Sequence, residues 1–97
     1  MKLTVTPAAV TWFKEEWDFE EGDQIKLFVR YGGDSTIHAA FSMGIVKDEP
    51  KNIGISTIAD GITFYVEQDE LWYLDGRDLT LDYSQEKDEI DFQVSGK

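Results

Sequence analysis

The chain has 97 residues, of which 41% are hydrophobic and 13% aromatic, so we expect one small folded domain over residues 1–97. Nine basic and twenty acidic side chains give a formal net charge of −11, which argues against nucleic acid and membrane partners because both attract clustered Lys and Arg. Cysteine is absent, which excludes disulfides and thiolate ligands within one chain, and the lack of an opening apolar run predicts a cytoplasmic protein.

The first predicted elements are a short strand over residues 2–6 and a helix after it. Thr6 has the hydroxyl of a helix cap, and Pro7 suits the first helical position, where its missing N–H would be unpaired anyway. Four apolar residues then recur at helical spacing and predict a core-facing stripe: Ala9, Val10, Phe13 and Trp17. Trp12 lies at the edge of this stripe, so we expect it to be the more exposed tryptophan. A ligand or partner surface is the alternative role for the two rings.

The pattern then changes to a period of two, which is typical of strands. Gly22 and Asp23 predict a turn before a strand that ends near Tyr31. Residues 32–36 predict a break, residues 37–46 a second strand, and residues 47–52 a charged loop. Asp60-Gly61 is a strong hairpin signal between two further strands, which we expect over residues 53–58 and 62–66.

The last third of the chain begins with an ambiguous segment, residues 68–74, which suits either a helical turn or a strand. Asp75-Gly76 predicts a turn. Alternating apolar residues then predict two more strands, around 79–83 and 90–94. The whole pattern predicts a β-rich α+β domain: a curled mixed sheet or sandwich of about seven short strands, with one N-terminal helix packed on it.

Motifs for catalysis are weak. Asp34, Ser35 and His38 are triad residue types, but neighbours within one turn point in different directions, and no G-x-S-x-G elbow surrounds the serine. The glycine turn at residues 32–36 lacks the Gly-Lys-Ser/Thr ending of a phosphate loop. Acidic runs at residues 75–82 and 86–91 do not match a calcium loop and are interpreted as solvated faces. We therefore expect a protein that is not an enzyme.

Three stretches occur in an order that points to one family. Leu3–Ala9 predicts a strand, a capping residue and an alanine-rich helix start; Tyr31–Phe41 contains Gly-Gly-Asp-Ser; Leu71–Tyr83 contains Tyr-Leu-Asp-Gly and then Leu-Asp-Tyr. Together they resemble the HesB/IscA family of A-type iron–sulfur cluster assembly and carrier proteins. The resemblance covers nearly the whole chain and implies that family's fold and a role in iron–sulfur cluster biosynthesis.

The resemblance also shows what this chain lacks. Asp34 stands where the family has its first ligand cysteine, and the family's C-terminal Cys-Gly-Cys has no counterpart. Gly33, Ser35 and Gly76 carry over as turn residues of the family motifs. No iron–sulfur cluster is therefore expected. Asp34 and His38 are candidate Fe(II) ligands, because carboxylate and imidazole suit ferrous iron, and a homodimer would double this set of two.

Two functional hypotheses follow from these observations. The first is an accessory or iron-handling protein of iron–sulfur cluster biosynthesis that is not a cluster carrier, with partners in the assembly machinery. The second is a protein-interaction module without metal, whose acidic surface binds a basic protein. Bound metal would favour the first hypothesis, and salt-sensitive capture of a partner without metal would favour the second.

Overall fold

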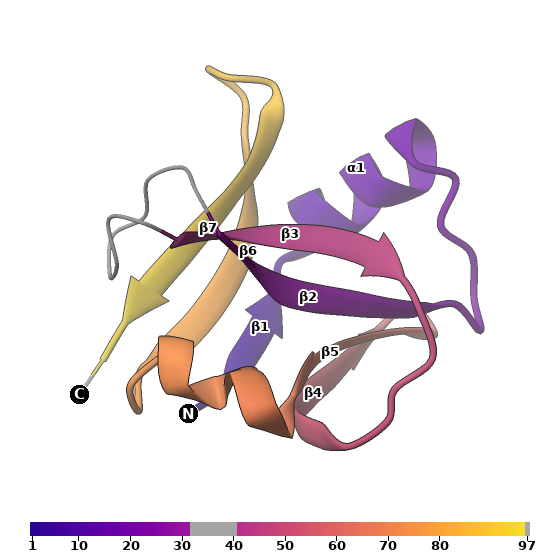
Figure 1. Cartoon of the computed structure of the whole chain (residues 1–97). Helices are drawn as coiled ribbons and strands as arrows, with labels where there is room; N and C mark the ends of the chain where they lie inside the picture. The colour runs from indigo at the N-terminus through magenta and orange to yellow at the C-terminus, as the bar shows by residue number, and fades with distance from the viewer. Residues whose placement is uncertain (32–40, 97) are drawn as a thin grey trace.

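The computed structural model describes residues 1–31 and 41–96. Within them the chain forms seven strands, one α-helix and one 3-10 helix (Figure 1), which confirms the predicted β-rich α+β class. The elements in chain order are β1 (Leu3–Val5), α1 (Pro7–Glu16), β2 (Gln24–Tyr31), β3 (Phe41–Lys47), β4 (Ile53–Ala59), β5 (Ile62–Glu67), η1 (Gln68–Tyr73), β6 (Asp78–Ser84) and β7 (Glu89–Ser95).

The strands form two mixed sheets that share one core. One sheet has the order β1-β6-β7 and the other β3-β2-β5-β4. Each contains one parallel pair, β1 with β6 and β2 with β5, and its other neighbours are antiparallel. Strand β1, at the edge of the first sheet, lies close to β4, at the edge of the second. The curled mixed arrangement expected from the sequence is therefore confirmed.

The start of α1 is fixed by the residue that precedes it. The Thr6 hydroxyl accepts a hydrogen bond from the backbone N–H of Ala9 at 3.2 Å and donates one to Asp82 Oδ1 at 2.7 Å. Pro7 occupies the first helical turn, as predicted. One side chain thus both caps the helix and ties it to β6, a strand that is distant in the sequence.

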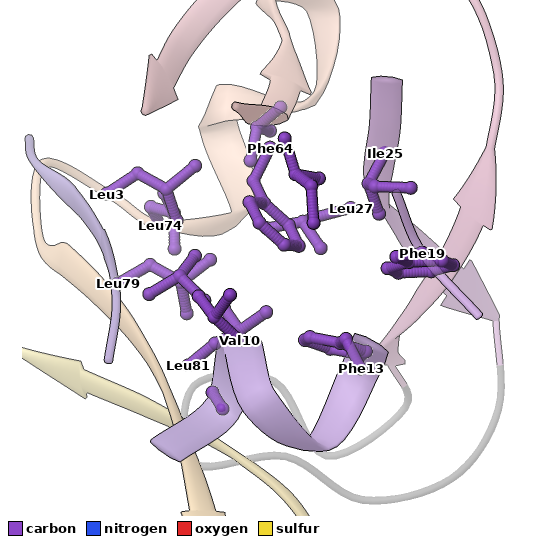
Figure 2. Close-up of a cluster of buried hydrophobic side chains, with 14 of the residues drawn as sticks. Leu3, Val10, Phe13, Phe19, Ile25, Leu27, Phe64, Leu74, Leu79 and Leu81 are labelled. Atoms are coloured by element: carbon purple, nitrogen blue, oxygen red, sulfur yellow. The ribbon is translucent and has the colours of Figure 1, made fainter. Parts of the chain in front are cut away.

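The core lies between the two sheets and the inner face of α1 (Figure 2). Ala9, Val10 and Phe13 of the predicted stripe are buried, but Trp17 is 42% exposed, so its assignment to the core was wrong. The prediction that Trp12 is the more exposed tryptophan was also wrong, since Trp12 is half-buried. The helix ends at Glu16, and Trp17 is its C-cap with φ −112° and ψ 3°, so its ring no longer follows the helical stripe.

The turns follow the predicted glycines. Asp60 and Gly61 have φ of 51° and 77°, and Asp75 and Gly76 have φ of 52° and 79°. At Asp60-Gly61, which joins the antiparallel β4 and β5, two successive left-handed residues match the right-handed twist of a hairpin. Asp75-Gly76 lies in the turn between η1 and β6, and Asp and Gly tolerate positive φ best. The ambiguous segment before Asp75 is the 3-10 helix η1. Of the second predicted strand, the part from residue 41 onward is β3; residues 37–40 lie outside the described ranges.

The charged loop before β4 is held by two side chains of β5. Glu67 is 6% exposed, and its carboxylate accepts hydrogen bonds from the backbone N–H groups of Lys51 and Asn52 at 3.1–3.2 Å. The hydroxyl of the buried Tyr65 donates to the carbonyl of Asp48 at 2.7 Å. Burial and the nearby negative charge of Asp48 raise the pKa of Tyr65 to about 12. These contacts give a loop of polar residues a defined backbone path.

Candidate functional site

The residues that the sequence nominated for iron lie in a segment that the structure does not describe. Asp34 and His38, together with the turn residues Gly33 and Ser35, fall outside the described ranges 1–31 and 41–96. Their role as ligands therefore stays a prediction. Gly76, the remaining motif residue, lies in the turn between η1 and β6 with φ 79°.

Within the described part of the chain, no group of three or more His, Cys, Asp or Glu side chains is arranged to hold a metal ion. The acidic run after η1 has structural contacts instead. Asp82 accepts hydrogen bonds from the Thr6 hydroxyl and from the N–H of Tyr83 at 2.7–2.8 Å. Asp78 lies 4.0 Å from the amino group of Met1. Asp78 and Asp82 thus make separate structural contacts and do not converge on one site.

A concave surface is formed where α1 meets the hairpin of β6 and β7. We call it the aromatic–acidic hollow; its volume is about 360 Å³, and it is lined by Ala8, Thr11, Trp12, Glu15, Glu16, Tyr83 and Asp88. The rings of Trp12 and Tyr83, which both line it, stack on each other with centroids 6.3 Å apart and planes inclined by 29°. The hollow therefore combines an aromatic wall with carboxylates from two different elements.

Helical and strand periodicity explain why these residues meet. Positions 8, 11, 12, 15 and 16 recur at intervals of three and four, so they share one face of α1. On β6, Tyr83 follows the buried Leu79 and Leu81 at intervals of two and so lies on the same face of the strand. Tyr83 extends beyond the core to the edge of the helix, where its ring meets Trp12.

The aromatic wall is anchored in the core. Trp12 packs edge-on against Phe13, with ring centroids 5.5 Å apart, and lies 5.9 Å from Trp17. Phe13 is fully buried and stacks on Phe19 at 5.2 Å (Figure 2). A surface ring that contacts three other rings has few alternative rotamers. The wall is therefore preorganised rather than assembled when a ligand arrives.

The carboxylates of the hollow are fixed in part and unneutralised. Tyr83 donates a hydrogen bond to Asp88 Oδ1 at 2.7 Å, and this bond, with burial and the charges of Asp88 and Glu16, raises the pKa of the Tyr83 phenol. Among the ion pairs between described residues, none involves Glu15, Glu16 or Asp88. The nearest lysines in sequence pair elsewhere: Lys14 with Asp60 at 3.1 Å and Lys87 with Asp91 at 3.9 Å.

Sequence reasoning did not find this hollow. It placed Trp12 at the edge of the helical stripe, with a ligand or partner surface as the alternative role, and interpreted residues 86–91 as a solvated acidic run. The usable signal was the combination of two kinds of residue on one helix face, since Trp12, Glu15 and Glu16 lie within one turn and a half. What could not be seen is that the β6–β7 turn brings Tyr83 and Asp88 onto that same face.

Comparison with known proteins identifies the class to which this fold belongs. The model of the family described as iron-sulphur cluster biosynthesis matches residues 1–97, so the chain is a member of that family, as the sequence motifs indicated. A solved structure of Escherichia coli SufA, involved in biosynthesis of iron-sulfur clusters, has the same fold. Its TM-score is 0.63 at 23% identity, over 97% of this chain and 79% of that one.

Two curated relatives match along nearly their full length. The pyruvate dehydrogenase inhibitor of Bacillus subtilis (strain 168) is 47% identical over 93 residues, covering 96% of this chain and 98% of the relative. An uncharacterized protein of Staphylococcus saprophyticus is 35% identical over 95 residues, covering 95% and 97%. Among the described residues, no helix is long and apolar enough to cross a membrane.

Proposed function

We propose that this protein is a binding inhibitor of pyruvate dehydrogenase that does not carry an iron–sulfur cluster and is not itself an enzyme. The observation that carries the proposal is the 47% identity to the Bacillus subtilis pyruvate dehydrogenase inhibitor, which extends over 96% of this chain. At that level the two chains share the fold over nearly their whole length.

The sequence and the structure support a role in binding rather than in metal chemistry. With no cysteine in the chain, thiolate ligation of a cluster within one protomer is ruled out. The surface, by contrast, carries a net charge of −11 and a hollow with an aromatic wall. Aromatic side chains are enriched where proteins bind one another. The interaction module is thus the stronger of the two hypotheses drawn from the sequence.

The test is a titration of the purified protein into a pyruvate dehydrogenase assay that follows NADH formation. We expect inhibition that saturates at a fixed ratio of protein to enzyme. Treating the purified protein with an iron chelator, and removing the chelator before the assay, should leave the inhibition unchanged, because binding does not depend on iron. If the enzyme keeps its full activity at a large excess of the protein, the proposed function is wrong.

A second candidate function is favoured by the family match over residues 1–97. In that role the protein is an accessory of iron–sulfur cluster biosynthesis that handles Fe(II) through Asp34 and His38, working with the assembly machinery. Two ligands are few for one site, so a homodimer would complete the set. Anaerobic calorimetry with Fe(II) tests it: tight binding that is lost in both Asp34→Ala and His38→Ala supports iron handling, and absence of heat rejects it.

A further inference from the structure

We propose that the aromatic–acidic hollow is the docking site for an arginine side chain that projects from the surface of the protein partner. This inference rests on the proposed function, since it names the partner chemistry of a binding inhibitor. It assigns a role to residues of α1 and of the β6–β7 hairpin, and it uses neither Asp34 nor His38. The argument has three steps: the wall, the charge and the rigidity of the hollow.

The wall fits a flat cation. Trp12 and Tyr83 both line the hollow, and their rings stack on each other with planes inclined by 29°. The negative face of an aromatic ring attracts a cation above it, and Trp is the best of the aromatic residues for this. A guanidinium group is planar and weakly hydrated, so it stacks on such a face better than the compact, strongly hydrated ammonium of lysine.

The charge of the hollow selects a basic group. Glu15 and Glu16 approach from α1, and Asp88 approaches from the hairpin. A guanidinium has five N–H donors, which two or more carboxylates can share. The described lysines nearest in sequence, Lys14 and Lys87, pair with Asp60 and Asp91, outside the hollow. A basic group of the partner can therefore pair with these carboxylates without displacing an ion pair between described residues.

The hollow is built before the partner arrives. Trp12 is held by Phe13 of its own helix, by Trp17 at the helix C-cap and by Tyr83 from β6. Asp88 has φ 53° in the hairpin turn and accepts the Tyr83 hydroxyl proton in a hydrogen bond. Side chains that are already ordered lose little entropy on binding. The strong overall negative charge also speeds the encounter with a basic partner.

The direct test measures binding of a fluorescein-labelled peptide with a single arginine among neutral residues, by anisotropy at low salt. Three variants are compared with the unchanged protein: Trp12→Leu, the double variant Glu15→Gln/Glu16→Gln, and the control Glu49→Gln/Asp69→Asn. The control removes the same charge from exposed sites outside the hollow. Circular dichroism confirms that each variant is folded.

We expect the first two variants to bind the peptide about tenfold more weakly than the unchanged protein, and the control to stay within about twofold. Replacing the arginine of the peptide by lysine should also weaken binding, because the stacking contact is reduced. Equal losses in the control and in Glu15→Gln/Glu16→Gln would show that net charge alone attracts the peptide. Either that result or unchanged binding by Trp12→Leu overturns the proposal.

The same variants in the pyruvate dehydrogenase assay separate the two proposals. If the unchanged protein fails to inhibit, the proposed function is wrong while the peptide measurement still decides the role of the hollow. If the unchanged protein inhibits and the hollow variants inhibit equally well, the proposed function stands and the docking site is wrong. Loss of inhibition in the hollow variants, with the control intact, supports both.

Discussion

Replacing Phe13 by leucine tests how the core supports the surface. The Phe13 ring is fully buried and has centroid distances of 5.2–5.6 Å to the rings of Trp12, Trp17, Phe19 and Phe64. Aromatic pairs are each worth about 0.5–1.5 kcal/mol beyond the area they bury. Leucine restores much of the apolar area, and neighbouring contacts are not additive. We therefore expect Phe13→Leu to lower the free energy of unfolding by about 2–3 kcal/mol.

The assay is urea unfolding followed by far-UV circular dichroism, with Phe64→Leu as the matched control. Phe64 is buried to the same degree but, among the described residues, has one such ring contact, to Phe13, so we expect about half the loss there. Such losses are measurable because the free energy of unfolding of a small domain is roughly 5–15 kcal/mol in total. If Phe13→Leu costs no more than Phe64→Leu, the aromatic contacts are not what stabilises this region.

Three further predictions concern contacts described above. Glu67→Ala should lower the free energy of unfolding by about 3 kcal/mol in urea, since two loop amides lose a charged acceptor, and Glu67→Gln by about half of that; a loss below about 1 kcal/mol for the alanine variant would contradict this role. The raised pKa of Tyr65, about 12, means that the folded state favours the neutral phenol. Its contribution to stability is therefore complete below about pH 10 and is lost as the pH rises toward 12. An ultraviolet titration of phenolate should accordingly lose a late-titrating component in Tyr65→Phe, and an unchanged curve would argue against it. Thr6→Ala should cost about 1–2 kcal/mol by thermal unfolding, because the helix cap and the bond to Asp82 are both lost; Thr6→Ser should retain most of that stability, and equal losses in the two variants would refute the capping argument.

Much of the fold could be predicted because local chemistry determines it. A capping threonine before a proline set the start of α1, and Asp-Gly pairs set two turns, since few other residues adopt positive φ at low cost. Alternating apolar residues located β2, β6 and β7, because the side chains of a strand with one buried face alternate between core and solvent. These signals involve only a few neighbouring residues, so they can be recognised in a single sequence.

The remaining features depend on contacts between distant segments. Trp17 fits the helical stripe in sequence, but the helix ends one residue before it, and its ring packs on Phe13 and Phe19 as a half-exposed cover. The hollow needs the β6–β7 turn to meet α1, which no local pattern encodes. Asp34 and His38 were nominated by a resemblance in sequence, and their geometry remains outside the described ranges.

The parallel pairing of β1 with β6 has a consequence for synthesis in the cell. Residues 3–5 pair with residues 79–81, and Thr6 bonds to Asp82, so the segment that contains β1 is made well before the strand with which it pairs. Folding coupled to translation can therefore build the β4–β5 hairpin early, but neither the β1–β6 pair nor the tie from Thr6 to β6 forms until β6 has left the ribosome. Proteins with such non-local pairing fold slowly, and the nascent chain exposes the apolar face of α1 throughout that wait. Because β1 and α1 dock only after β6 is available, we expect chaperones to bind the apolar face of α1 during synthesis.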